Sequence, residues 1–216
     1  GVPAHQIDLV YNGIDTSRFF PGENISLRGE WGWSDRTIFL LVAHNFRLKG
    51  VREAIDALAE LRRQGERVGL LVAGGGRIGS YARHAARQGV GDSVRFLGNT
   101  RDIIPIYHAA DDYVGLTHYD PCSLVDLEAL ACGLPSITTA INGASELMTP
   151  AIGEVIDHPQ DHLSLVRAMA RFLNENERQQ ARERARLAMA RQTLAANSDR
   201  LIQIYRNLRV TSSTAA

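Results

Sequence analysis

The stretch TIFLLVA at residues 37–43 is an uninterrupted apolar run. Residues 50–64, GVREAIDALAELRRQ, place apolar side chains three and four positions apart, and VGLLVA at residues 68–73 is a second apolar run. Short apolar runs are typical of buried strands, and the spacing between these two is typical of a helix. The three segments together predict a right-handed strand–helix–strand unit in a parallel sheet that is covered on both faces.

The same alternation continues outward from this unit. We expect further strands at 94–97, 113–117 and 136–139, and helices at 77–88, 101–110 and 123–132. After Pro159 the pattern becomes helical only, with helices at 161–173, 175–191 and 195–208. The prediction is an α/β fold: one domain over residues 1–210, built as a doubly wound, Rossmann-like parallel sheet with C-terminal helices, and a disordered tail at 211–216.

Composition excludes several classes of protein. The 216 residues carry 24 acidic and 24 basic side chains, and this zero net charge argues against a nucleic-acid partner. The apolar runs are far shorter than the ~20 residues that span a bilayer, so no transmembrane segment is expected. Cys122 and Cys132 would lie ~15 Å apart on one helix, too far for a disulfide. Two such thiols favour a reducing, cytoplasmic location.

In a doubly wound sheet, ligands bind at the carboxyl ends of the strands. A candidate site is therefore expected in the loops at 44–49, 74–79, 98–101, 118–123 and 140–146. The first of these loops contains Arg47 and Lys49 at the start of a helix, where anions are stabilised. Lys49 is the only lysine of the chain, and we interpret the pair as a phosphate site; the alternative is two solvated surface cations.

The segment from Asp120 to Pro135 is the most specific one. Asp120 precedes a predicted helix and Glu128 lies within it, while the amides of Ser123 and Leu124 are expected to point out of the helix start as a second anion site. Carboxylates only accept hydrogen bonds, so the two acids suit the hydroxyl groups of a ribose or a sugar. The alternative makes Asp120 a helix cap and Glu128 a surface residue.

Glu128 borders the apolar face formed by Leu124, Leu127 and Leu130. We therefore expect its carboxylate to be partly buried and to have a partner.

Three other motifs have structural interpretations. The segment Gly74–Gly79 matches the dinucleotide pattern G-x-G-x-x-G, but no acidic residue ends the next strand, so a tight turn is favoured over NAD binding. Asn142 or Ser145 is expected to cap a short helix, and a contact between this segment and a ligand is as strongly indicated as its absence. The segment Asn12–Asp15 is predicted to be a structural turn.

The chain resembles the C-terminal, donor-binding domain of GT-B retaining glycosyltransferases of the family 4 type. The resemblance rests on motifs spread over nearly the whole chain: Asn12–Asp15 with Phe20-Pro21, Lys49-Gly50, Gly74–Gly76, Val94–Gly98, Ala110-Asp111 and Leu127–Pro135. The loop at 46–50 is most similar to bacterial lipopolysaccharide-core glucosyltransferases. Three positions depart from the family pattern: Asp120 replaces the usual Glu, Cys122-Ser123 the usual Phe-Gly, and His44 the usual Gly.

The resemblance implies a role for each matching position. Lys49 and Arg47 would neutralise the diphosphate, Asp120 would contact the transferred sugar and Glu128 the ribose. The amides of Ser123 and Leu124 would hold the distal phosphate. The base would lie near Gly98–Arg101, and the implied donor site is completed by Cys122, Gly98, Asn99, Arg101, His44 and Gly75.

The implied activity is metal-independent, retaining transfer of a hexose, with a UDP-sugar favoured as donor and a glycan or glycolipid as acceptor. No cofactor is expected. The acceptor half is expected to precede Gly1, so this chain alone is predicted to be inactive, and Leu201, Ile204 and Tyr205 of the last helix would be exposed or self-associate. The full-length enzyme could be peripheral on the inner face of a membrane. Alternatives are half of a nucleotide-sugar epimerase, a dinucleotide-dependent oxidoreductase or a nucleotide sensor.

Overall fold

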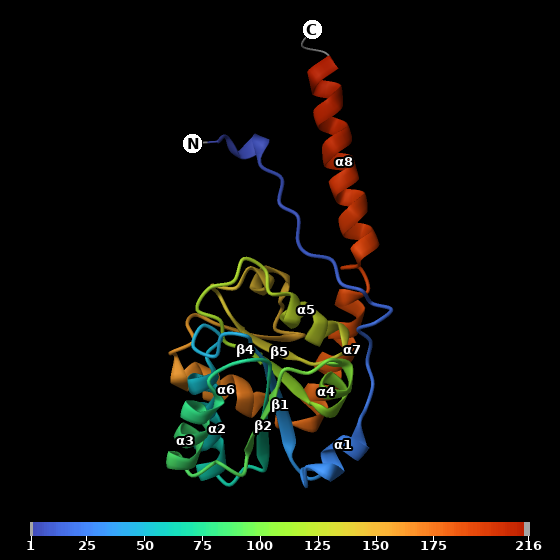
Figure 1. The fold of residues 1–216 in the computed structure, drawn as a ribbon. Helices are drawn as coiled ribbons and strands as arrows, with labels where there is room; N and C mark the ends of the chain where they lie inside the picture. The colour runs from blue at the N-terminus through green and yellow to red at the C-terminus, as the bar shows by residue number, and fades with distance from the viewer. Residues whose placement is uncertain (1, 214–216) are drawn as a thin grey trace.

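The computed structural model describes residues 2–213, and within them six strands form one parallel sheet (Figure 1). The strands are β1 (Thr37–Val42), β2 (Val68–Ala73), β3 (Val94–Gly98), β4 (Asp112–Gly115), β5 (Ser136–Thr139) and β6 (Gly153–Ile156). Their order in the sheet is β3-β2-β1-β4-β5-β6. The direction of winding therefore reverses between β1 and β4, which is where a doubly wound sheet binds its ligands.

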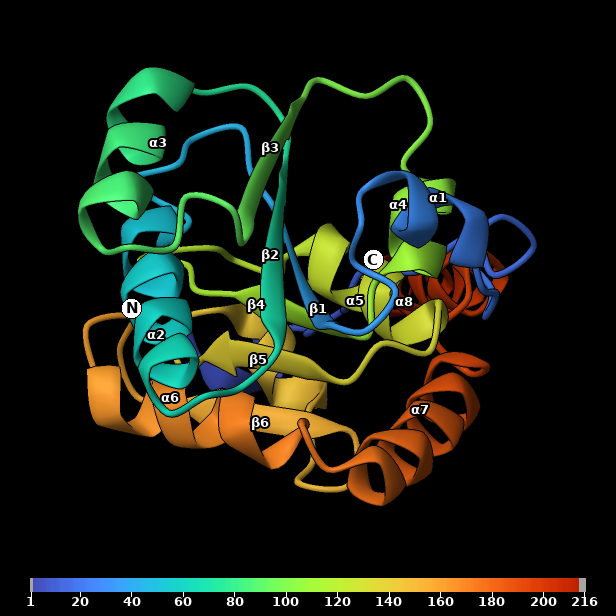
Figure 2. The ribbon, with the colours of Figure 1, turned by 90° about the horizontal axis from the view of Figure 1, so that it is seen from below.

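Helices cover both faces of the sheet (Figure 2). One face carries α2 (Val51–Arg63), α3 (Ile78–Arg87) and α6 (His162–Arg171), and the other carries α4 (Ile104–Ala109) and α5 (Leu124–Ala131). Helix α7 (Glu175–Met189) packs against α5. The remaining elements are α1 (Ile25–Glu30), α8 (Leu194–Ser213) and the 3-10 helices η1 (Ala4–Gln6) and η2 (Gly143–Leu147).

The core explains why the strands lack an alternating pattern. Every residue of β2 is buried, as are the central four of β1, because side chains on both faces of the sheet lie under helices. Two apolar clusters result, one on each face. The predicted fold class, a doubly wound parallel sheet covered on both sides, is confirmed.

Several boundaries differ from the prediction. Strand β6 and helix α1 were not expected, since Gly153–Ile156 includes the half-buried Glu154 and the exposed Val155, and Ile25–Glu30 buries no residue. Helix α8 continues to Ser213, into the predicted tail, and 214–216 lie outside the described residues. The turn expected at Asn12–Asp15 is shifted: the chain is extended through Ile14 and turns at 16–18.

Helix α8 extends away from the rest of the molecule, with the N-terminal segment alongside its first half (Figure 1). The Asn197 side chain donates to the Tyr11 carbonyl at 2.6 Å, and Arg200 pairs with Asp8 at 2.8 Å. Tyr205 is 68% exposed and Leu201 40%. Tyr205 and Leu201 are therefore exposed, as predicted, whereas Ile204 is half-buried. None of the helices within residues 2–213 is long and apolar enough to cross a membrane.

Candidate functional site

The loops that follow β1 and β4 are joined directly at the point where the winding reverses. The backbone amide of His118 donates to the Leu48 carbonyl at 2.8 Å. Gly50, which starts α2, has φ of +64° and lies against Leu116, where a Cβ would collide with the Leu116 carbonyl. Only glycine adopts this conformation and fits this space readily. The loops that lead into α2 and α5 therefore meet at one edge of the sheet, as predicted.

Lys49 and Asp120 form the centre of this edge. The Lys49 Nζ atom donates to Asp120 Oδ2 at 2.5 Å, and the two side chains are only 17% and 20% exposed. The other Asp120 oxygen, Oδ1, accepts from the Cys122 amide at 3.1 Å. Asp120 thus orders its own loop, while Ser123 occupies the cap position of α5. The alternative interpretation of Asp120 as the helix cap is wrong.

The start of α5 is less open than predicted. Ser123 is buried, and its amide donates to Asn142 Oδ1 at 3.1 Å. Asn142 also accepts from the Ala144 amide, capping η2 as expected, and donates to Thr138 Oγ1 at 2.8 Å. The Ser123 amide is therefore not available to a ligand in this structure, and Asn142 is a structural bridge rather than a ligand contact.

Leu124 also departs from the expected arrangement. Leu127 and Leu130 are fully buried, but the Leu124 side chain is 47% exposed because it stands at the first position of α5, on the open edge. Amides in the first turn of a helix have no intrahelical acceptor. The first turn of α5, beginning at Leu124, thus keeps donor groups at this edge although Ser123 does not.

Glu128 is half-buried and partnered, as predicted. The Tyr107 hydroxyl donates to Glu128 Oε2 at 3.0 Å, and Tyr107 itself is fully buried. Burial raises the pKa of the Glu128 carboxyl, while the hydrogen bond from Tyr107 lowers it. A carboxylate fixed in this way has its remaining acceptor positions in a defined direction.

Arg47 and His44 are exposed on the first loop. No hydrogen-bond acceptor for the Arg47 guanidinium is found among the described residues. Arg47 lines a hollow of about 660 Å³ that lies over the beginning of α2 and includes Arg52, Tyr81 and His118. A flexible cation beside an open hollow, next to the fixed Lys49, can follow an anionic ligand.

The glycine-rich turn after β2 and the end of β3 are also brought together. The Gly74 amide donates to the Gly98 carbonyl at 2.7 Å, and Gly75 lies beside the Asn99 side chain. Asn99 and Arg101 are exposed. These residues form a separate part of the same carboxyl edge, on the β2–β3 side of Lys49.

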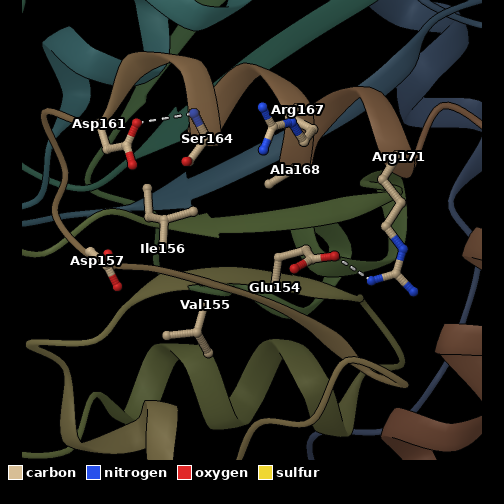
Figure 3. Close-up of a pocket in the computed structure, with 9 residues that line it drawn as sticks. All are labelled: Glu154, Val155, Ile156, Asp157, Asp161, Ser164, Arg167, Ala168 and Arg171. Carbon is tan, nitrogen blue, oxygen red and sulfur yellow. Dashed lines mark hydrogen bonds and ion pairs between the residues drawn. The ribbon is translucent and has the colours of Figure 1, made fainter.

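Another hollow, of about 440 Å³, lies between β6 and α6 (Figure 3). Three of its charged side chains have hydrogen-bond partners: Glu154, Asp161 and Arg171. Arg171 donates to Glu154 at 2.5 Å and to Glu177 at 2.9 Å, and Asp161 accepts from the Ser164 amide at 3.1 Å. No predicted site residue lines this hollow, and we assign it no function.

Two residues near the site had not been singled out for it. The Asn12 side chain, expected only in a turn, donates to the Cys122 carbonyl at 3.1 Å and so holds the Asp120 loop from the N-terminal segment. Asp126, in the first turn of α5, is 1% exposed. Its place beside Glu128 in the otherwise apolar segment 124–130 was the available signal, but the helix dipole favours an acidic residue in a first turn without any burial.

These features define a doubly wound α/β domain whose carboxyl edge carries Lys49, Arg47 and the first-turn amides of α5. Residues 24–188 match the model of the family described as "Glycosyl transferases group 1". The chain belongs to this family, and its fold is the Rossmann-like fold of GT-B glycosyltransferases.

The chain is 32% identical over 197 residues to glycogen synthase of Mycobacterium tuberculosis, covering 90% of this chain and 45% of that protein. It therefore spans about half the length of the curated relatives that it matches. Among solved structures, WaaG, a glycosyltransferase involved in lipopolysaccharide biosynthesis, superposes with a TM-score of 0.78 at 26% identity, covering 94% of this chain and 57% of WaaG. Anabaena Alr3699/HepE in complex with UDP-glucose superposes with a TM-score of 0.83 at 21% identity, covering 96% and 59%.

Proposed function

We propose that this chain binds a nucleotide-diphosphate sugar, with a UDP-sugar as the favoured donor, and that it is the donor half of a retaining hexosyltransferase. The observation that carries the proposal is the Lys49–Asp120 pair, held between two joined loops at the switch point of the sheet. The Lys49 ammonium group suits a phosphate, and the Asp120 carboxylate suits a sugar hydroxyl. Because the two side chains are in contact, together they suit a ligand in which a diphosphate is bonded to a sugar.

The proposed roles follow the order of groups along such a donor. Lys49 and Arg47 neutralise the diphosphate, together with the first-turn amides of α5 from Leu124 onward. Asp120 accepts hydrogen bonds from the sugar, and Glu128 accepts them from the ribose. The base lies by the β3 loop, near Gly98, Asn99 and Arg101, with Gly75, His44 and Cys122 at the margins of the site.

The chemistry requires stabilisation of the leaving group. When the bond between the anomeric carbon and the phosphate oxygen breaks, negative charge develops on the departing diphosphate. Fixed cations and helix-start amides stabilise that charge without reorganisation. In a retaining reaction of this kind, the acceptor hydroxyl attacks from the face that the diphosphate leaves, and its proton passes to a phosphate oxygen. We propose that this arrangement needs no metal ion, so a chelator should leave transfer unchanged.

The comparisons support a nucleotide-sugar donor but do not distinguish which nucleotide it carries. The structure of Alr3699/HepE was solved with UDP-glucose, and two relatives are named as GDP-mannose-dependent mannosyltransferases, so the nucleotide differs among them. We propose a glycan or glycolipid acceptor, bound by a part of the enzyme outside these residues, and hence no transfer by this chain alone. A cytoplasmic location, at the inner face of a membrane where the acceptor is a lipid, is consistent with two free thiols.

Calorimetric titration of the chain with UDP, GDP, ADP and NAD tests the proposal. We expect a nucleoside diphosphate to bind and NAD not to; a preference for NAD would refute the donor role and favour an oxidoreductase.

Because Lys49 is the only lysine, an amine reagent has one side-chain target besides the N-terminal amine. A bound nucleoside diphosphate should protect Lys49, but not the N-terminus, from modification as followed by mass spectrometry. Equal labelling of Lys49 with and without nucleotide would contradict its assignment.

A further inference from the structure

Asp126 is a buried acid in α5, the helix whose start belongs to the candidate diphosphate site. It lies in the first turn of α5, is 1% exposed, and its Oδ1 atom accepts no hydrogen bond from any described residue. Its carboxyl group packs flat against Gly115 at the end of β4, where a Cβ would collide with both oxygens. The fold therefore reserves space for this carboxyl group but leaves part of it unsatisfied.

Charged and polar groups approach Asp126 from each element around it. Lys49 comes from the loop before α2, Asp120 and Cys122 from the loop before α5, and Tyr113 from β4. Ser123 and Thr138 are its polar neighbours on α5 and β5. Burial raises the pKa of Asp126 from 3.8 to about 6; the Ser123 and Thr138 side chains and Lys49 oppose the rise, and Asp120 adds to it.

One ammonium group therefore faces two carboxyl groups. Lys49 contacts Asp120 at 2.5 Å, and both groups interact electrostatically with the Asp126 carboxyl group. With Asp126 ionised, these three groups sum to one negative charge; with Asp126 protonated, they sum to zero. A diphosphate that carries two negative charges meets less repulsion in the second state, and low solvent exposure keeps the difference large.

We propose that Asp126 takes up one proton from solvent when the diphosphate of a nucleotide sugar binds at the start of α5, so that this buried acid couples donor affinity to pH. The inference rests on the proposed donor site. Asp126 is a positioning residue for charge and does not itself touch the ligand. The only bond made is an O–H bond on its carboxyl group, and the proton comes from water or buffer.

Linkage fixes the expected size of the effect. For one coupled proton, affinity falls by about tenfold for each pH unit between the pKa of Asp126 in the free chain, about 6, and its higher pKa in the complex. At pH 7, the number of protons taken up on binding should approach one. Below pH 6, the acid is protonated before the ligand arrives, and both effects should fade.

The experiment is calorimetric titration with UDP-glucose at about pH 5.5, 6.5 and 7.5, each in two buffers that differ in ionisation enthalpy, which counts the protons taken up. The phosphates of UDP-glucose are diesters that do not titrate in this range, so any uptake belongs to the protein. Wild-type chain should show uptake and weakening affinity as the pH rises. Asp126→Asn should show neither, and at pH 7.5 it should bind more tightly than wild type.

The matched control is Asp112→Asn. Asp112 is also fully buried and has two unpartnered carboxyl oxygens. It is the first residue of β4, whereas Asp126 packs against Gly115 at the other end of that strand. This variant should keep the pH dependence and proton uptake of wild type. If Asp126→Asn keeps the pH dependence and the proton uptake, the proton belongs to another group and the inference is overturned.

The remaining outcomes separate the inference from the proposed function. Binding of UDP-glucose by wild type with the same affinity at all three pH values overturns the role of Asp126 and leaves the donor site standing. Failure to bind any nucleotide sugar at any pH overturns both. Because uptake is measured on the unmodified chain, its absence would overturn the inference even if the Asp126 variant did not fold.

Discussion

Replacing Asp126 by asparagine should change how the stability of the fold depends on pH. The carboxyl group ionises at its ordinary pKa of 3.8 in the unfolded chain and at about 6 in the folded chain, because burial disfavours its charge. Each pKa unit between the two states corresponds to about 1.4 kcal/mol, so ionisation of Asp126 costs the folded state about 3 kcal/mol. Since the folded chain holds the proton longer, the contribution of Asp126 to wild-type stability falls as pH rises from about 4 to about 6 and then levels off.

Urea unfolding of wild type and Asp126→Asn across this pH range measures the effect. The free energy of unfolding of the variant relative to wild type should rise by about 2.4 kcal/mol between pH 4 and pH 7, because the unfolded chain has already lost much of its Asp126 proton at pH 4. A fixed gain or loss from the new amide is the same at every pH and cancels. Asp161→Asn is the control of opposite sign, because a hydrogen bond from Ser164 lowers the pKa of Asp161. Parallel pH profiles for Asp126→Asn and wild type would refute the reasoning.

Three further outcomes are expected. Lys49→Ala and Arg47→Ala should each weaken UDP binding by about 2 kcal/mol and leave uridine binding unchanged in calorimetry; equal losses for both ligands would remove them from the diphosphate. Glu128→Gln should weaken UDP more than 2′-deoxy-UDP, and Tyr107→Phe should do so to a smaller extent; equal effects on the two nucleotides would exclude a ribose contact at the 2′ hydroxyl. Asn142→Ala should lower the free energy of unfolding by about 2–4 kcal/mol, because it leaves the buried Ser123 amide without an acceptor; a loss under about 0.5 kcal/mol would show that this bridge is dispensable.

The fold was predictable because its central strands are buried on both faces. Residues 37–43 and 68–73 cannot be amphipathic strands of an exposed sheet, and the helical pattern between them leaves few topologies. Strand β6 was missed for the converse reason. As an edge strand it has Glu154 half-buried and Val155 exposed, so its sequence carries little of the apolar signal that marked the inner strands.

The candidate site was predictable as a set of loops but not as a set of contacts. Position at the carboxyl ends of strands follows from chain order, so Lys49 and Asp120 could be placed on the same edge. Their hydrogen bond and the capture of the Ser123 amide by Asn142 depend on contacts between residues 71 and 19 positions apart. Local periodicity says nothing about such pairs, and this is why the Ser123 amide was wrongly expected to be open.

The pairing of Lys49 with Asp120 gives a physical reason for a lysine at this position in a chain whose other basic side chains are all arginines. An ammonium group has three donor hydrogens on one small, rotatable centre. It can keep one hydrogen bond to Asp120 while another turns to a phosphate oxygen, and therefore does not have to abandon the carboxylate before a ligand binds. A guanidinium group is planar and favours a bidentate contact with a single carboxylate. In the proposed donor site, where one cation would hold both a sugar-binding acid and a diphosphate, the point charge is the better match, and the exposed Arg47 would supply the forked contact from outside.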